Sequence, residues 1–263
     1  MIRALYSAAS GMTAQQISID TIANNLANAN TAGYKARRTQ FQDLLYQNVV
    51  QPGTAAGSQT IVPNGLQIGL GTRPSSNSIV FTQGAFQLTE NPLNLVIQGK
   101  GFFQIKLPSG SIAYTRAGNF QLDSTGNIVD SNGNALQPQI NIPAASQSVA
   151  IASDGTVSYT IPNQSAAQVA GQIQLANFIN PGGLNAVGSG YFEPTDASGE
   201  AQLGVPGGQE GVGTLQQGYL ETSNVSVVEE FINMIGSQRA YEANSKVVKA
   251  ADEMYQQVNN LAT

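Results

Sequence analysis

The sequence predicts an α+β protein with paired coiled-coil helices at its two ends, a central all-β domain and an extended insertion. Three observations lead to this prediction. Apolar residues recur at helical spacing near both termini, short β-prone runs separated by turn residues fill the middle, and a stretch rich in Gly, Pro, Ser and Thr follows the first helix. The two helices are expected to pair, because each apolar stripe needs a partner in order to leave water.

The first helix is predicted from apolar residues that recur at alternating spacings of three and four. The members of this seam are Leu5, Ala8, Met12, Gln15, Ile19, Ile22, Leu26 and Ala29. Only Gln15 is polar, which is typical of a coiled-coil seam. The pattern indicates a helix of roughly 25 residues. Its end is expected between Asn28 and Gly33, where Gly can adopt the left-handed conformation that closes a helix.

The segment that follows is polar and poor in large apolar side chains. Residues 47–78 are rich in Gly, Pro, Thr and Ser and are predicted to be extended or loop-like. Composition leaves two alternatives open, a disordered tether or a segment that orders against a partner. The small basic cluster before it, formed by Lys35, Arg37 and Arg38, is expected to be a solvated loop.

The central region is predicted to be built of β-hairpins, because short β-prone runs alternate with Gly, Pro, Asn and Asp pairs. Gly99-Lys100-Gly101 is expected to turn a hairpin between two apolar strands, since it lacks the second Gly and the Ser or Thr of a phosphate-binding loop. The expected strands are 93–97, 102–107, 112–116, 119–122, 127–129, 149–151, 156–161 and 172–178.

The last helix is predicted to begin at a capping-box pattern, Ser226 to Glu229. Glu229 and Glu230 point about 100° apart on a helix, so they are not expected to bind one substrate together. Their carboxylates are expected to stabilise the positive N-terminal end of the helix. The apolar stripe that follows comprises Val227, Phe231, Met234, Tyr241, Val247, Ala251, Met254, Val258 and Leu261.

Composition excludes several classes of function. The chain has no His and no Cys, which removes imidazole bases, Cys–His nucleophiles and thiolate or imidazole metal sites. The net charge is −5, and no Lys or Arg lies between Arg116 and Arg239, so nucleic acid is not an expected partner. Asp130, Asn132 and Asn134 are similar to the first half of a calcium loop, but no Glu follows at its twelfth position, and turns explain them. No catalytic residue, cofactor, metal or membrane insertion is expected.

Four motifs carry a family resemblance. Residues 23–35 resemble the N-terminal signature of the flagellar rod and hook proteins, and residues 98–103, 114–120 and 217–225 resemble further motifs of that family in the same order. The resemblance covers nearly the whole chain. Its signature residues are Asn24, Asn25, Leu26, Ala27, Asn28, Gly33 and Tyr34.

The resemblance implies a subunit of a helical tube in the basal body, exported without a cleaved signal, whose terminal helices line the inner wall and whose β-domain forms the outer wall. It implies that the chain binds copies of itself, proximal rod proteins, hook or hook-junction proteins and the surrounding rings. The implied regions are 1–45 and 221–263 for the helices, 46–78 for the extended segment and 79–220 for the β-domain. The expected assembly interface comprises Leu5, Met12, Ile19, Ile22, Leu26, Val227, Phe231, Met234, Tyr241, Val247, Met254 and Val258.

Within the family, residues 46–73 resemble the insertion of one particular rod subunit, and they are expected to order between neighbouring subunits. The residues expected to form this inter-subunit contact are Gln51, Pro52, Gly53, Pro63, Gly65, Ile68 and Gly69. Two alternatives remain, another rod or hook subunit and, from a different class, a secreted β-rich carbohydrate-binding or adhesive module. Such a module does not need helical seams at both ends.

Overall fold

A computed structural model describes residues 2–53, 64–162, 166–208 and 211–262. The chain divides into two compact units. The helical unit comprises Met1–Ala27, Arg37–Ile79 and Ser226–Thr263, and the β unit comprises Asn28–Ala36 and Val80–Val225. This division differs from the expected boundaries at 45, 78 and 220, because residues 28–36 join the β unit and residues 37–79 join the helices.

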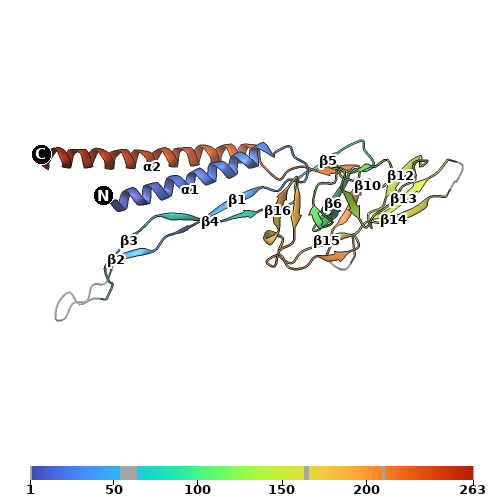
Figure 1. The fold of residues 1–263 in the computed structure, drawn as a ribbon, viewed down its shortest axis with the longest axis horizontal. Coiled ribbons are helices and arrows are strands. Elements are labelled where there is room, and N and C mark those ends of the chain that lie inside the picture. The colour runs from blue at the N-terminus through green and yellow to red at the C-terminus, as the bar shows by residue number, and fades with distance from the viewer. Residues whose placement is uncertain (1, 54–63, 163–165, 209–210, 263) are drawn as a thin grey trace. The chain divides into compact units, whose positions relative to one another are not determined.

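Two long helices form the frame of the helical unit. Helix α1 (Ile2–Ala27) and helix α2 (Val227–Ala262) run antiparallel beside each other (Figure 1). α1 ends at Ala27, so Gly33, which has a positive φ of 70°, lies too far along the chain to close the helix as expected. At the start of α2, Glu229 N donates to Ser226 Oγ at 3.5 Å, which confirms the predicted N-cap.

The segment expected to be loop-like contains strands where the structure describes it. Strand β1 (Arg37–Asp43) pairs antiparallel with β4 (Thr72–Ile79), and β2 (Tyr46–Val50) pairs antiparallel with β3 (Leu66–Gly69). Of the two expected forms for residues 47–78, extended or loop-like, these parts are extended, although their pairing into strands was not predicted. A strand ladder is held by backbone hydrogen bonds, so it can form from polar residues that give no apolar signal.

The β unit is built around a nine-stranded sheet. Its main order is β16-β17-β8-β7-β11-β10-β9, with β15 pairing with β7 and β18; a three-stranded sheet β12-β13-β14 and the pairs β19-β6 and β20-β5 complete the unit. The strand bounds are β5 Phe86–Leu88, β6 Leu95–Gln98, β7 Phe102–Lys106, β8 Ile112–Thr115, β9 Gln121–Leu122, β10 Ile128–Val129, β11 Ala135–Gln137, β12 Ser148–Ile151, β13 Thr156–Thr160, β14 Gln168–Gln172, β15 Leu175–Asn177, β16 Asn185–Gly188, β17 Tyr191–Glu193, β18 Gln202–Gly204, β19 Thr214–Gln217 and β20 Tyr219–Glu221. A short 3-10 turn, η1, spans Pro181–Gly183.

One apolar core fills the β unit. Phe103 and Phe120 are fully buried and meet edge to face, with ring centroids 5.0 Å apart. Around them pack fully buried aliphatic side chains from β6, β7, β10, β11 and β15, which include Leu95, Ile97, Ile105, Ile128, Leu136 and Leu175. This core gives the β unit a rigid frame on which its polar groups are held.

Two strand predictions need correction. The run 172–178 was expected to be one strand, but it contributes the end of β14 and all of β15, which belong to different sheets. Gly99-Lys100-Gly101 does not turn a hairpin, because β6 pairs with β19 whereas β7 pairs with β8, β11 and β15. The positive φ values of Gly99 (110°) and Gly101 (133°) instead carry the chain from one sheet to another.

Candidate assembly interface

The four family motifs meet at one buried carboxylate in the β unit. Glu221, at the end of β20, is 2% exposed. Its Oε1 accepts hydrogen bonds from Lys35 Nζ at 2.6 Å and from Gly84 N at 2.9 Å. Its Oε2 lies 3.3 Å from Arg116 Nε, an ion pair without hydrogen-bond geometry. We call Lys35, Arg116 and Glu221 the ionic cluster. Each of these residues comes from a different motif, and the remaining motif, residues 98–103, supplies backbone carbonyls that bind Arg116.

The remaining donors of the two cations are also used. Lys35 Nζ donates to Thr82 O at 2.8 Å. Arg116 Nη1 donates to Gly101 O at 2.7 Å, and Nη2 donates to Gly99 O at 2.9 Å. The expectation that Lys35 lies in a solvated loop was wrong: Lys35 is 3% exposed.

Burial sets the electrostatics of this cluster. It lowers the pKa of Lys35 from its ordinary value of 10.5, and the neighbouring carboxylate of Glu221 opposes that change. Burial likewise lowers the pKa of Arg116, again against the effect of Glu221. The charges offset one another, so the arrangement is suited to holding chain segments together rather than to exchanging protons.

Residues 28–36 are fastened to the β unit by backbone contacts as well. Gly33 N donates to Glu221 O at 2.8 Å, and a Cβ at Gly33 would lie within 2.6 Å of Ala117 N. Asn224 Oδ1 accepts from Ala36 N at 2.7 Å. The signature glycine is therefore required both by its positive φ and by its close approach to another segment.

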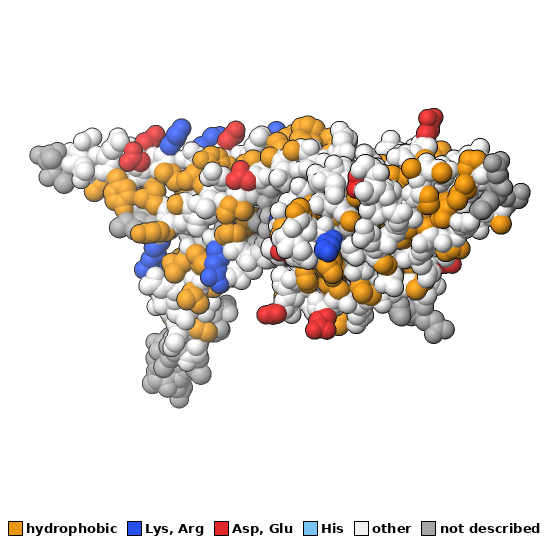
Figure 2. All heavy atoms as spheres, turned by 45° about the vertical axis from the view of Figure 1, so that its right-hand side comes forward, with side chains coloured by type: hydrophobic (Ala, Val, Ile, Leu, Met, Phe, Trp, Pro, Cys, Tyr) orange, Lys and Arg blue, Asp and Glu red, His pale blue; other side chains and the backbone are white. Residues whose placement is uncertain are grey.

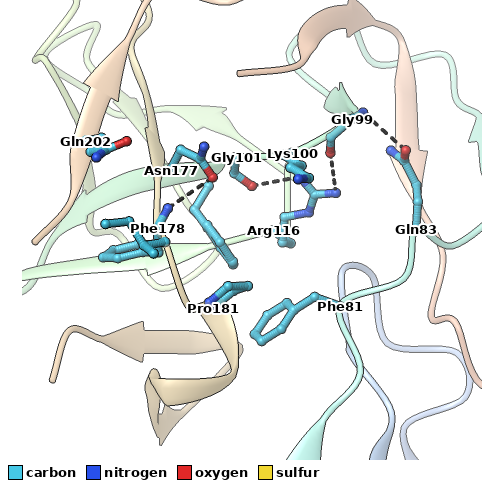
Figure 3. A pocket seen from close by; sticks show the side chains of 12 residues that line it. Phe81, Gln83, Gly99, Lys100, Gly101, Arg116, Asn177, Phe178, Pro181 and Gln202 are labelled. Atoms are coloured by element: carbon cyan, nitrogen blue, oxygen red, sulfur yellow. Dashed lines mark hydrogen bonds between the residues drawn. The ribbon is translucent and has the colours of Figure 1, made fainter. Parts of the chain in front are cut away.

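A pocket of about 510 Å³ opens beside the ionic cluster (Figure 3). Arg116 points between Gly99 and Gly101, and the rings of Phe81 and Phe178 form apolar walls. Among its described lining residues there is no carboxylate and no hydroxyl that could act as a nucleophile or base. The full lining is Phe81, Gln83, Gly99, Lys100, Gly101, Phe102, Arg116, Asn177, Phe178, Ile179, Pro181 and Gln202.

In the helical unit, the signature residue Asn25 joins three elements. Its Nδ2 donates to Arg37 O at 2.8 Å and to Glu230 Oε1 at 3.1 Å, and its Oδ1 accepts from Arg37 N at 2.9 Å. Asn25 is 1% exposed. The side chain thus pairs with the backbone of β1 as a neighbouring strand would, and it links α1 to α2.

The contact between α1 and α2 includes small and polar residues at three levels. Asn25 meets Glu230, Ser18 Oγ lies 3.3 Å from Ser237 Oγ, and a Cβ at Gly11 would lie 2.7 Å from Asn244 Nδ2. Of the predicted seam residues, Ala8 and Ile22 are buried, whereas Met12, Ile19 and Leu26 each follow one of these positions by one residue and are half-buried.

The structure places the expected interface residues of α1 and α2 differently. On α1, Ile22 is buried, and Leu5, Met12, Ile19 and Leu26 are half-buried. On α2, Met234 is half-buried, but Val227, Phe231, Tyr241, Val247, Met254 and Val258 are exposed, by 40% to 53%. The expectation that the α2 stripe is buried against α1 within one chain was therefore wrong, and its apolar side chains are open to a partner.

The first turns of α2 present a compact apolar face. Its members are Val227, Val228, Phe231, Ile232 and Ile235, which are 42% to 71% exposed. At 100° per residue they fall within one arc of the helix, away from the line of Glu230 and Ser237 that meets α1. Figure 2 shows hydrophobic side chains gathered on the visible surface of the helical unit, with charged side chains between them.

The hairpin of β2 and β3 is exposed and partly apolar. Leu45 is 85% exposed, and Tyr46, Val49 and Leu66 are each more than half exposed. Of the expected inter-subunit residues, Gln51, Pro52 and Gly53 follow β2, Gly65 lies against Pro52, and Ile68 and Gly69 lie in β3; Pro63 is outside the described residues.

Residues 130–134, which are similar in sequence to the first half of a calcium loop, form a turn. Asp130 Oδ1 accepts from the backbone N of Asn132 and of Asn134, each at 2.9 Å, and its Oδ2 accepts from the Tyr191 hydroxyl. In the part of the chain that the structure describes, no group of three or more acidic residues is placed to hold a metal ion. Neither described helix has a stretch apolar enough to cross a bilayer.

Comparison with known proteins agrees with this arrangement. Residues 5–35 match the family described as flagella basal body rod protein, residues 96–159 match the flagellar hook protein FlgE/F/G D1 domain, and residues 216–261 match the flagellar basal body rod FlgEFG protein C-terminal family. Full-length relatives share 40% to 48% of their residues with the chain. The chain belongs to the flagellar rod and hook protein family.

Its relatives include individual rod proteins. The flagellar basal-body rod protein FlgG of Caulobacter vibrioides is 48% identical over 99% of both chains, and that of Bacillus subtilis is 40% identical over 99% of both chains. The flagellar hook-basal body complex protein FlhP of Bacillus subtilis is 30% identical over 99% of this chain and 100% of its own. The solved hook protein FlgE2 of Helicobacter pylori aligns over 71% of this chain and 43% of its own, at 13% identity and a TM-score of 0.25.

Proposed function

We propose that this chain is a structural subunit, not an enzyme, of the distal part of the bacterial flagellar rod. Copies of it assemble into a rigid hollow shaft that transmits torque from the motor to the hook. Family membership and the FlgG relatives support the rod, and the likeness of residues 46–73 to the insertion of the distal rod protein supports the distal position. Its location is the flagellar basal body.

One observation carries the self-assembly part of this proposal. The apolar face of α2 is left uncovered by its own chain, although burying a side chain such as Phe231 or Ile235 fully stabilises by about 1.5–3 kcal/mol. A face of this kind on a helix is a docking surface for another helix. In a stack of identical subunits, every copy both offers this face and covers that of a neighbour.

The pairing of α1 with α2 as a coiled coil and the docking of residues 46–78 between subunits belong to the same proposal. The exposed apolar side chains of the β2–β3 hairpin favour the second of these. By family membership the shaft also meets proximal rod proteins at one end, hook or hook-junction proteins at the other, and the rings around it.

The assembly proposal is tested with Phe231→Glu in the full chain. A carboxylate at this position would have to lose its water in a helix interface, so we expect loss of assembled rods seen by electron microscopy and loss of motility in a complemented strain. Ala243→Glu adds the same charge at an exposed position of α2 more than two turns beyond the apolar face and should assemble normally. Rods of normal length and number from Phe231→Glu would contradict the proposal.

A further inference from the structure

The contacts between α1 and α2 repeat with a fixed period. Gly11, Ser18 and Asn25 are seven residues apart on α1, and their partners Asn244, Ser237 and Glu230 are seven residues apart on α2. Seven residues make close to two helical turns, so all three levels lie on one line along each helix. We name these three levels the polar ladder.

One level of the polar ladder is matched in size, and the other two are matched in hydrogen bonding. Asn244 lies where α1 has no side chain, at Gly11, and the two serine hydroxyls face each other 3.3 Å apart. Asn25 donates to the carboxylate of Glu230 while its other contacts hold β1. Polar groups in a helix contact are costly unless they find partners.

Only one register satisfies all three levels. Sliding α2 by one heptad would bring Glu230 opposite Ser18 and would move Asn244 away from the space at Gly11. Purely apolar contacts discriminate less strongly between registers, because one aliphatic side chain can replace another with little loss of stability. A polar residue in a helix seam is a known way to select register at some expense of stability.

We propose that the polar ladder is the specificity determinant that pairs the α1 and α2 of one chain in a single antiparallel register. It leaves exposed apolar side chains of α2, such as Phe231 and Ile235, outside the intramolecular contact. A second copy of this chain can then cover them without competing for the ladder. This last step depends on the proposed self-assembly, whereas the register does not.

The register is tested by disulfide trapping, for which the chain is suited because it contains no Cys. The next step of the ladder falls at Ala4 and Ala251, and Ala251 is 2% exposed. Ala4→Cys with Ala251→Cys reports the proposed register, and Ala4→Cys with Val258→Cys reports a shift of one heptad. In the full chain we expect the first pair to close faster by more than about tenfold, as a seam with a specified register requires.

The role of the ladder is tested by replacing two of its residues in both reporters. Asn25→Leu with Glu230→Leu should reduce the preference to less than about threefold, because the register-selecting group is gone. Gln16→Leu with Gln238→Leu adds the same two leucines at exposed positions of the same helices and should retain the preference. If the leucine ladder variant loses helix content, Asn25→Asp, which places a second carboxylate against Glu230, should produce the same reduction.

The trapping is carried out on dilute chains and on assembled rods. Equal closure of both reporters in the unaltered ladder, no closure of the in-register pair in either state, or an unchanged preference in the ladder variants would each overturn the inference. Rod formation is scored separately by electron microscopy. A preserved register preference in a chain that forms no rods would contradict the proposed function while leaving the register inference intact.

Discussion

At the scale of single residues, one buried carboxylate explains why four motifs far apart in the sequence occur together. Glu221 binds Lys35 directly, and Arg116 extends the contact to Gly99 and Gly101. The motifs could be recognised from the sequence as a family signature, but their joint role could not. No periodicity links residues 35, 116 and 221, since their proximity is produced by the fold of the β unit.

Loss of Lys35 should destabilise the β unit. In Lys35→Met the carboxylate of Glu221 stays buried and keeps Arg116 but loses its closest cation, so we expect the free energy of unfolding to fall by about 1–3 kcal/mol. Urea unfolding of the full chain measures this change. Lys106→Met, which removes an exposed lysine of the same unit, should change it by less than about 0.5 kcal/mol.

The same cluster allows a double-mutant cycle. In Lys35→Met with Glu221→Gln neither partner of the Lys35–Glu221 ion pair remains, so the combined loss should be smaller than the sum of the two single losses by about 0.5–3 kcal/mol. Strict additivity would show that Lys35 and Glu221 do not stabilise each other.

Glu230 should make the stability of the helical unit depend on pH. Burial raises its pKa above the ordinary value of 4.5, the nearby Glu229 adds to the effect, and Asn25 and Arg38 oppose it. When the pH falls through the raised pKa toward 4.5, the folded state takes up the proton before the unfolded state does, so stability rises; it falls again as the pH increases.

Circular dichroism of helix unfolding from neutral pH down to pH 4.5 checks this sign. Glu230→Gln cannot titrate, and the difference between wild type and this variant isolates the contribution of Glu230. Glu229→Gln, at an exposed neighbouring position, should keep most of the wild-type dependence. A difference curve in which wild type gains stability as the pH rises would contradict the assignment.

At the scale of elements, the sequence predicted both helices and strands β6 to β10, β12, β13 and β15, because apolar periodicity reports which side chains leave water. It did not predict β5, β11, β14 or β16 to β20. Nor did it predict β1 to β4, since their residues are polar or exposed and their pairing is made by the backbone. It also misplaced the helix contact. The strongest apolar stripe of α2 was assumed to face α1, whereas the face toward α1 carries Ser237 and Asn244.

That error has a physical cause. Periodicity shows that a helix has an apolar face, but it does not show whether the partner lies in the same chain or in another copy. In an assembling subunit the two faces differ: the intramolecular contact is specified by polar groups, and the apolar face remains for neighbours. The signal in the sequence that could have located the contact between the helices is the small residues, Gly11 and Ser18 on α1 and Ser237 on α2.

At the scale of the whole molecule, the described residues of a single chain leave many apolar side chains uncovered, and three groups of them lie in the helical unit. These are the face around Phe231 on α2, the far end of α2 near Met254 and Val258, and the β2–β3 hairpin around Tyr46. The helical unit and the β unit each have internal contacts that do not depend on these surfaces. Each unit of the chain is therefore folded by its own contacts while these apolar surfaces stay exposed, as the proposed self-assembling shaft requires.

The last prediction concerns the hairpin. Deleting residues 53–70 removes β3 but leaves α1, α2, the pairing of β1 with β4 and the whole β unit encoded, so the stability of the isolated chain should change little. If the hairpin locks one subunit to the next, neighbouring protofilaments in the deleted shaft can slide, and the shaft should bend. Turn residues such as Pro52 and Gly65 favour a defined hairpin, and ordering it is repaid only when its exposed apolar side chains pack against a partner.

The measurement is the curvature of assembled rods in electron micrographs, with wild type prepared in the same way. Leu66→Ser with Ile68→Ser keeps the length of the hairpin while removing two of its exposed apolar side chains, and it should bend the shaft in the same direction as the deletion. Gln67→Ser, in the same strand, should leave the shaft straight. Straight rods of unchanged stiffness from the deletion would show that the hairpin is a tolerated loop, and they would favour a different rod subunit of similar length, because the distal assignment depends on this segment.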